Sequence, residues 1–341
     1  MAALVIEAPG RLGSTILPIP DRAPGCVLVR PRYVGLCGTD LELLHGTASY
    51  FRDGRAGYPH VFGHEWWGEV IATDSIAGIA QGDPVIGHTM VSCGLCSCCQ
   101  QGRRQLCQRM AEVGLYSQQG AAAEYIRLPA HALTRLPDAL AAPWAVLVEP
   151  AVTVVEALER AGCGLADRVA VVGTGTVGLL AVQLAGRRAG RVEAIGVDPA
   201  GLELAVRCGA AAMHMTDDAP MRAYSLVVEA SGAPSAFLRS LQLVADGGRV
   251  AVIGVANDPV DGMVPGEIAL RGISVHGIRH GLDHYEQTVQ LFADGVFDGD
   301  CLVATVMPAV NATRAFELLA HGRSGRPKVI LDLTGPRRAP R

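Results

Sequence analysis

The feature that most constrains the fold of this chain is a glycine-rich turn between an apolar strand and an apolar helix. The segment reads Val169-Ala-Val-Val-Gly173-Thr-Gly175-Thr176-Val177-Gly178 and runs on into an apolar helical stretch. Gly173 permits a tight turn, Gly175 lets the backbone approach a pyrophosphate, and Gly178 lets the helix pack against the strand. The phosphates then bind at the helix N-terminus, where Thr176 and Val177 lie. This pattern predicts the first strand–turn–helix of a Rossmann fold.

An acidic residue at the end of the following strand indicates which dinucleotide binds. Asp198 ends the apolar run 194–198 and lies 20 residues after Gly178. A carboxylate there accepts hydrogen bonds from the ribose hydroxyls and repels a 2′-phosphate. The next three residues are Pro, Ala and Gly, without an arginine to bind that phosphate. The sequence predicts NAD rather than NADP; the alternative is a structural glycine turn with a surface aspartate.

The chain separates into three zones that differ in composition and in the pattern of apolar residues. From about residue 167, the short apolar runs 169–172, 192–197, 226–229 and 250–254 alternate with the helical stretches 177–188, 201–208 and 235–244. This repetition predicts an α/β doubly wound parallel sheet over residues 151–278. Residues 1–150 are rich in Gly, Pro and His with short β-like runs, which favours an antiparallel β domain. Residues 279–341 are too few to bury a core of their own, so we expect them to return to the first domain.

Composition excludes several classes of protein. Half of the 341 residues are hydrophobic, 18% are charged, and the net charge is −4. Such a chain folds compactly and offers no basic surface for nucleic acid. The N-terminus lacks the charged and long apolar regions of a signal peptide, and glycines interrupt the uncharged stretch 169–186. We therefore expect a cytoplasmic protein with no nucleic-acid or membrane partner.

Five of the ten cysteines fall in one short segment, at positions 93, 96, 98, 99 and 107. Closely spaced thiolates on turning backbone suit the tetrahedral sulfur coordination of Zn²⁺. A site with four protein sulfurs is closed and therefore structural. An iron–sulfur cluster is one alternative, and a nucleic-acid-binding zinc ribbon using Arg103 and Arg104 is another. A disulfide framework is disfavoured without a secretion signal.

A second group comprises Cys37-Gly38-Thr39-Asp40 and Gly63-His64-Glu65. Singly, a cysteine in a β domain is usually core and a histidine is usually hydrogen-bonded. Together with the nucleotide fold and the cysteine segment, this group resembles the zinc-containing medium-chain alcohol dehydrogenase family, over essentially the whole chain. Further matches are Gly82-Asp83, Gly120-x-x-Ala123-Glu124-Tyr125, Leu136-Pro137-Asp138, Val148-Glu149-Pro150 and Val228-Glu229-Ala230-Ser231-Gly232. Glu149-Pro150 looks most like the polyol branch, which includes sorbitol and threonine dehydrogenases.

The resemblance implies a GroES-like catalytic domain, a Rossmann domain and two zinc ions per chain. It makes Cys37 and His64 ligands of a catalytic zinc, with Glu65 as the third ligand and Glu149 either replacing it or binding the metal-bound water. A catalytic zinc keeps one position open, and it acidifies an oxygen bound there. The structural zinc ligands are implied to be Cys93, Cys96, Cys99 and Cys107, which leaves out Cys98.

Other roles follow from the same resemblance. Thr39 is expected to accept the proton of the substrate hydroxyl, although a local turn hydrogen bond would also explain it. Many family members pass the proton on through a histidine where this chain has Glu42, so Glu42, His45 or solvent takes that step. Thr153 is expected to pack against the nicotinamide.

Three further expectations concern an arginine, two tryptophans and the remaining cysteines. Arg279 stands where polyol-type members have an arginine on the substrate side, and a surface position is the equal alternative. Trp66 or Trp67 lines the substrate pocket unless both pack in the core. The remaining cysteines are expected to be buried apolar residues: Cys26, Cys163, Cys208 and Cys301.

The expected activity is the zinc- and NAD-dependent oxidation of a secondary alcohol on a polyol, sugar, aminocyclitol or hydroxy amino acid. Glu65-Trp66 and the missing relay histidine resemble aminocyclitol dehydrogenases, such as those acting on 2-deoxy-scyllo-inosamine. A threonine- or sorbitol-type dehydrogenase is the nearest alternative within enzymes. A catalytically silent NAD-binding structural or sensor protein is the alternative from another class. The family resemblance also implies a homodimer or homotetramer.

Overall fold

The computed structural model describes residues 1–21, 23–74, 78–321 and 325–335. Two compact units divide the chain. The first unit comprises Met1–Glu149, Val303–Arg323 and Lys328–Arg341, and the second comprises Pro150–Leu302 and Ser324–Pro327. The chain thus returns to the first unit at Val303, later than the expected residue 279.

The late return has a local cause in helix α9 (Tyr285–Ala293), which belongs to the second unit. His284, its N-cap, lies 2.9 Å from a carboxylate oxygen of Glu156 on α4 (Val148–Arg160). Gln287 donates a 2.6 Å hydrogen bond to Glu159 on the same helix. These contacts attach α9 to α4, and the pattern of apolar residues in the sequence does not reveal them.

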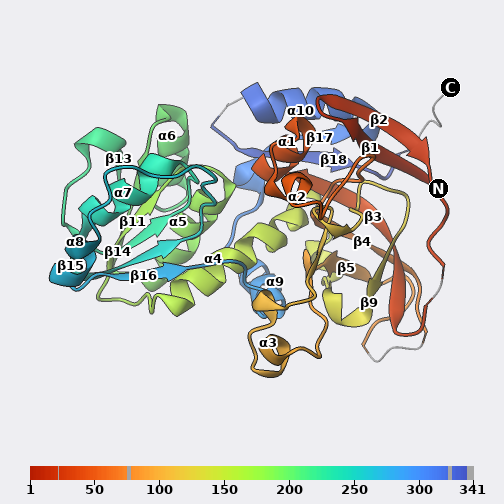
Figure 1. Cartoon of the computed structure of the whole chain (residues 1–341), viewed down its shortest axis with the longest axis horizontal. Helices are drawn as coiled ribbons and strands as arrows, with labels where there is room; N and C mark the ends of the chain where they lie inside the picture. The colour runs from red at the N-terminus through yellow and green to blue at the C-terminus, as the bar shows by residue number, and fades with distance from the viewer. Residues whose placement is uncertain (22, 75–77, 322–324, 336–341) are drawn as a thin grey trace. The chain divides into compact units, whose positions relative to one another are not determined.

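The second unit is built on a six-stranded parallel sheet in the order β13-β12-β11-β14-β15-β16. This order, with the first strand in the middle, is typical of dinucleotide-binding folds. Helices α5, α6 and α7 pack on the sheet, as Figure 1 shows. The strands are β11 (Arg168–Val172), β12 (Arg191–Gly196), β13 (Ala212–Met215), β14 (Tyr224–Glu229), β15 (Val244–Val252) and β16 (Ser274–Gly277). The helices are α5 (Thr176–Arg188), α6 (Pro199–Arg207), α7 (Pro234–Leu243) and α8 (Pro265–Leu270), besides α4 and α9.

The predicted doubly wound sheet is confirmed. It contains two further strands that the sequence analysis missed. The missed strands, β13 and β16, end the sheet, so their side chains are partly or fully exposed. The central strands β11 and β14 are almost wholly buried, and they gave continuous apolar runs. Edge strands lack that signal because only part of their surface is covered.

The glycine turn between β11 and α5 has the geometry that its sequence requires. Gly173 has φ of +106°, a conformation that other residues rarely adopt. A Cβ on Gly178 would lie 2.0 Å from the Gly173 carbonyl oxygen, so only glycine allows this helix to approach the turn. A Cβ on Gly175, the N-cap of α5, would meet nothing within 4 Å. The protein therefore leaves open space where a ligand can approach the backbone.

The first unit contains a seven-stranded sheet in the order β10-β5-β4-β3-β18-β17, with β9 also paired to β3. A two-stranded sheet (β1, β2) and a three-stranded sheet (β6, β7, β8) complete its β structure. The strands are β1 (Ala2–Ala8), β2 (Arg11–Ile16), β3 (Cys26–Leu36), β4 (Glu65–Ala72), β5 (Pro84–Gly87), β6 (Met90–Val91), β7 (Ala111–Val113), β8 (Ser117–Gln118), β9 (Ile126–Pro129), β10 (Leu133–Arg135), β17 (Val303–Pro308) and β18 (Lys328–Asp332). The helices are α1 (Gly38–His45), α2 (Ser49–Arg52), α3 (Ser97–Gln100) and α10 (Ala312–His321).

Both tryptophans after Glu65 pack in the interior of this unit. Trp66 is fully buried, and a Cβ on Gly87 would overlap its ring, so the glycine makes room for the indole. Trp67 is also buried and donates a 2.9 Å hydrogen bond to the Ala142 carbonyl. Of the two expectations for these residues, core packing is confirmed. Among the described residues, no helix is both long and apolar enough to cross a membrane.

Candidate metal centre and cofactor site

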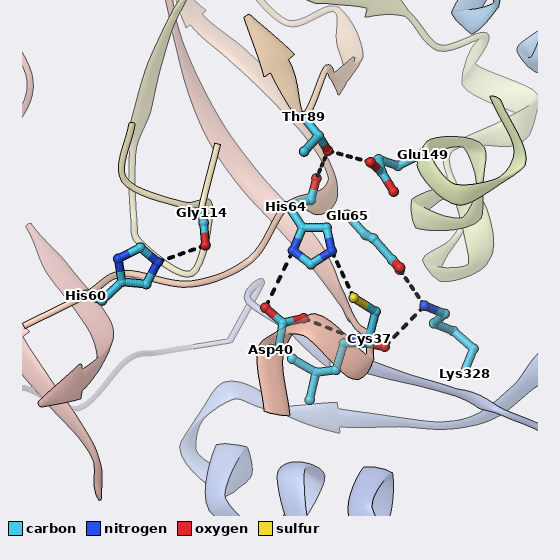
Figure 2. Close-up of polar contacts among 10 residues, drawn as sticks. Cys37, Asp40, His60, His64, Glu65, Thr89, Gly114, Glu149 and Lys328 are labelled. Carbon is cyan, nitrogen blue, oxygen red and sulfur yellow. Dashed lines mark hydrogen bonds and ion pairs between the residues drawn. The ribbon is translucent and has the colours of Figure 1, made fainter. Parts of the chain in front are cut away.

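Strand pairing in the first unit brings Cys37 and His64 together. Cys37 follows the last residue of β3 and is the N-cap of α1, whereas His64 directly precedes β4. Because β3 and β4 are antiparallel with Gly35 opposite Glu65, the end of one strand lies beside the start of the other. Cys37 Sγ lies 2.9 Å from His64 Nε2 (Figure 2). The ligand atoms of Cys37, His64 and Glu65 all lie within 4.8 Å of one another.

Asp40, in the first turn of α1, contacts both Cys37 and His64. One carboxylate oxygen accepts a 2.9 Å hydrogen bond from the Cys37 backbone N–H. The other lies 3.5 Å from His64 Nδ1, so the imidazole directs Nε2 toward the thiol. Burial lowers the pKa of His64, but Cys37 and Asp40 outweigh it and raise that pKa well above its usual value. A carboxylate behind a ligating histidine is the common supporting arrangement in metal sites.

Glu65 forms a buried ion pair with Lys328, the only lysine in the chain. Lys328 is the first residue of β18, and its ammonium group also donates a 3.1 Å hydrogen bond to the Leu36 carbonyl. Both side chains are almost completely buried. Burial raises the pKa of Glu65, Lys328 lowers it and the nearby Glu149 raises it, with a net rise. The carboxylate therefore lies beside a fixed positive charge on one side and the Cys37–His64 pair on the other.

Glu149 lies outside the group of three but is linked to it through Thr89. The Thr89 hydroxyl lies 2.6 Å from Glu149 Oε1 and 3.0 Å from the His64 carbonyl oxygen. Figure 2 shows Thr89 between the His64 backbone and the Glu149 carboxylate. Of the two candidate carboxylates, Glu65 is the one whose oxygen groups with Cys37 and His64.

The remaining residues expected at the catalytic and cofactor sites have the following positions. Thr39 and Glu42 are half-buried on α1, and His45 at the end of that helix is exposed. Thr153 is half-buried on α4, in the second unit. Arg279 is exposed, in the segment after β16.

The four cysteines of the predicted structural site come together in the first unit. Their Sγ atoms lie within 4.8 Å of one another, and the group is Cys93, Cys96, Cys99 and Cys107, without Cys98. The Cys107 sulfur accepts hydrogen bonds from two backbone N–H groups at 3.3 Å. Backbone and thiol hydrogen bonds lower the pKa of Cys93 to about 6, whereas burial raises the pKa of Cys99 to about 12.

Both groups of donors fit zinc. Four thiols from one lobe provide the closed sulfur set of a structural site. A thiol, an imidazole and a carboxylate provide three protein ligands, the number that a catalytic zinc uses while one position stays open. Buried Asp40 supports the histidine of this second set, as is usual for metal ligands.

On the dinucleotide side, Asp198 caps helix α6. Its carboxylate accepts hydrogen bonds from the backbone N–H groups of Ala200 and Gly201, at 3.3 and 3.1 Å. These bonds hold the carboxylate at the end of β12, beside the glycine turn of β11. Each carboxylate oxygen has a second lone pair for a ribose hydroxyl.

Sequence reasoning missed two residues at the candidate metal centre and misjudged four cysteines that lie outside it. Lys328 carried a signal, since it is the only lysine; Thr89 carried none. The expectation that the remaining four cysteines are buried is wrong, because all four are partly exposed: Cys26, Cys163, Cys208 and Cys301.

Comparison with known proteins gives two family matches. The family model of the alcohol dehydrogenase GroES-like domain matches residues 23–138, and that of the zinc-binding dehydrogenases matches residues 176–294. An L-threonine 3-dehydrogenase of Bacillus licheniformis is 29% identical, over 96% of this chain and 97% of the relative. A sorbitol dehydrogenase of Bacillus subtilis is 29% identical, over 89% of each chain.

Solved structures agree with these matches. An alcohol dehydrogenase from Thermus sp. ATN1 superposes with a TM-score of 0.87 at 29% identity, over 97% of this chain and 99% of that chain. A zinc-binding dehydrogenase of Sinorhizobium meliloti, bound to NADP, gives 0.87 at 27% identity, over 97% and 98%.

Proposed function

On the premise that the chain belongs to the zinc-containing medium-chain alcohol dehydrogenase family, in its polyol and threonine dehydrogenase-like branch, we propose that it oxidises a secondary alcohol to a ketone with NAD. The observation that carries this proposal is the convergence of Cys37, His64 and Glu65 within 4.8 Å. A protein that only bound NAD would have no use for this set of zinc donors, of which His64 and Glu65 are buried.

Cys37, His64 and Glu65 would hold the catalytic zinc. When bound, zinc acts as a Lewis acid that makes an alcohol hydroxyl acidic, and NAD accepts the hydride. Asp40 fixes the orientation of the imidazole, because its carboxylate faces Nδ1 at 3.5 Å. Lys328 balances the charge of Glu65, which leaves a ligand set of lower net charge.

Proton removal is assigned to residues of α1. Thr39 would accept the proton from the substrate hydroxyl, and Glu42, His45 or solvent would take it onward. Of these two side chains, Glu42 is better placed to take the proton from Thr39, because it is half-buried on α1 whereas His45 is exposed. Thr153 would pack against the nicotinamide from the start of α4.

The cofactor is proposed to be NAD on the strength of Asp198. A similar structure binds NADP, so membership of the family does not decide between the two cofactors. Asp198 is held by the two N–H groups of α6 with its negative charge at the ribose position of the fold. That charge would repel a 2′-phosphate.

A polar cluster in the first unit supports a hydroxyl-rich substrate. The Arg55 guanidinium lies over the rings of Tyr50 and Tyr116, at 5.0 and 4.5 Å from their centroids. The Tyr116 hydroxyl donates a 2.9 Å hydrogen bond to buried Glu112. Burial and Glu112 raise the pKa of Tyr50, and His64 partly offsets them. Such surroundings suit a polyol, sugar, aminocyclitol or hydroxy amino acid better than an aliphatic alcohol.

Two extensions of the proposal concern assembly and location. We propose a cytoplasmic homodimer or homotetramer. Strand β16 ends the parallel sheet, and Val275 on it is 39% exposed, so its outer edge offers a surface for pairing with a second copy. Size-exclusion chromatography with light scattering tests this state, and a monomer would contradict it.

The activity is tested by following NAD reduction with a panel of substrates. The panel contains sorbitol, L-threonine and 2-deoxy-scyllo-inosamine, with propan-2-ol as an aliphatic comparison. We expect turnover with at least one polar alcohol, and its loss in Cys37→Ser. Cys26→Ser is the matched control, because Cys26 begins β3, the strand that Cys37 follows, and lies outside both metal groups. NAD binding without turnover of any secondary alcohol would favour the silent NAD-binding protein.

A further inference from the structure

Two cysteines of the second unit form a thiol pair outside both groups of metal donors. Cys208 is the C-cap of α6, and Cys301 lies in the 3-10 helix Asp300–Leu302. Their sulfur atoms are 3.5 Å apart although 93 positions separate the residues in sequence. Both side chains are partly exposed. The pair is therefore preformed and accessible to a small reagent.

Gln183 on α5 holds the two sulfurs in place. Its side-chain amide N–H lies 3.3 Å from Cys301 Sγ and 3.7 Å from Cys208 Sγ. The same amide group bonds both backbone groups of Asp298, accepting from its N–H at 2.7 Å and donating to its carbonyl at 3.2 Å. The loop that carries Cys301 is thus tied to α5, beside the end of α6 that carries Cys208.

The two thiols have unequal acidity. The hydrogen bond from Cys301 lowers the pKa of Cys208. Burial raises this pKa and the hydrogen bond from Gln183 lowers it further, which leaves a value of about 7. The hydrogen bond to Cys208 and burial raise the pKa of Cys301. The Asp298 carbonyl oxygen lies 3.1 Å from Cys301 Sγ and is a second acceptor for the single proton of that thiol. Cys208 thus provides the thiolate, which is the reactive form, and Cys301 keeps its proton.

We propose that Cys208 and Cys301 are a redox site that closes into a reversible disulfide when a hydroperoxide oxidises Cys208. In the first step, the Cys208 thiolate attacks one peroxide oxygen. An S–O bond forms, the O–O bond breaks, and two electrons pass from sulfur to the peroxide, whose other oxygen leaves as hydroxide or alkoxide and takes up a proton. In the second step, Cys301 Sγ attacks the sulfenic sulfur. The S–S bond forms, the S–O bond breaks, and hydroxide leaves with the Cys301 proton as water.

The movement required for closure is small. The sulfurs must approach from 3.5 Å to about 2.05 Å. Disulfides of proteins in a reducing compartment are usually transient and redox-sensing, which fits a pair that is reduced at rest. Cys301 lies just before Val303, where the chain returns to the first unit. The disulfide would join the end of α6 to the segment at which the chain leaves the second unit.

Peptide mapping of the zinc-loaded protein tests the site. The protein is treated with hydrogen peroxide, its free thiols are alkylated, and tryptic peptides are identified by mass spectrometry. Cys208 and Cys301 fall in separate peptides, 208–222 and 280–314, each with a single cysteine. We expect these two peptides to be linked after oxidation and released by dithiothreitol, and the oxidised protein to unfold at a temperature several degrees higher.

Single variants assign the order of the steps. Cys301→Ser should leave a sulfenic acid on Cys208 that dimedone labels, whereas Cys208→Ser should leave Cys301 unoxidised. Cys163→Ser is the matched control, because burial raises the pKa of Cys163 to about 11, and it should behave like wild type. Recovery of both peptides with alkylated thiols, while peroxide oxidises cysteines elsewhere, would overturn the proposal. Linkage of either cysteine mainly to Cys163 or to the four-cysteine group would also overturn it.

Discussion

Removal of the only lysine should strongly destabilise the first unit. Lys328→Met keeps much of the length of the side chain but deletes the cation that faces Glu65. Both partners are almost fully buried, so the change leaves a carboxylate without its ion pair. Breaking a buried pair in this way costs about 3–5 kcal/mol. For a domain of about 150–250 residues, 1 kcal/mol moves Tm by about 2–4 °C, which gives a loss of roughly 6–20 °C.

The assay is thermal unfolding by circular dichroism at neutral pH, first on protein freed of metal with a chelator. Glu65→Gln/Lys328→Met is the matched variant, because it also removes the carboxylate charge and should recover part of the lost stability. Zinc should raise the Tm of Lys328→Met more than that of wild type, since the metal supplies a positive charge at Glu65. The reasoning is refuted by a Tm within about 2 °C of wild type, or by a double variant no more stable than the single one.

Four further substitutions have expected outcomes. Asp198→Ser keeps the helix cap but removes the negative charge. The ratio of kcat/KM for NADP to kcat/KM for NAD should therefore rise by about tenfold or more. An unchanged ratio contradicts the assignment of Asp198 to the ribose of NAD. Burial raises the pKa of Glu193, but hydrogen bonds from Arg191 and three other side chains lower it to about 2. Since this folded value lies below the unfolded value of about 4.3, the stabilisation is complete above about pH 5 and is lost as the pH falls toward 2. Glu193→Gln should therefore cost about 2–3 kcal/mol at pH 7 and almost nothing near pH 2, as urea unfolding across pH would show. Gly178→Val should prevent folding, because its Cβ would lie 2.0 Å from a carbonyl oxygen. Gly175→Ala should fold but bind NAD more weakly. Far-UV circular dichroism measures the folding of the two variants, and NAD titration measures their affinity for the cofactor.

The Rossmann sheet was predictable because its central strands can be recognised from the local sequence. Strands β11 and β14 are buried on both faces, so they appear as unbroken apolar runs between helices. Strand β13 alternates half-buried and exposed residues, and β16 is mostly exposed, so neither gives such a run. The glycine turn is likewise local, because its glycines act on the backbone within one short segment.

The metal centre was predictable only in part, because its support comes from distant segments. Cys37 and His64 stand in short motifs by which the sequence resembles the family. Glu65 and Lys328 are 263 positions apart, and the pairing of both β4 and β18 with β3 brings them together. No local pattern in the sequence encodes that pairing. The same holds for Thr89, which joins Glu149 to the His64 backbone from a separate loop.

Zinc content is the most direct test of the central claim that Cys37 and His64 belong to a catalytic metal site. Inductively coupled plasma mass spectrometry should find two zinc ions per chain in the wild type. Cys37→Ala should keep one, in the four-cysteine group, and lose dehydrogenase activity while remaining folded. A wild-type protein with a single zinc ion, still present in Cys37→Ala, would contradict the account.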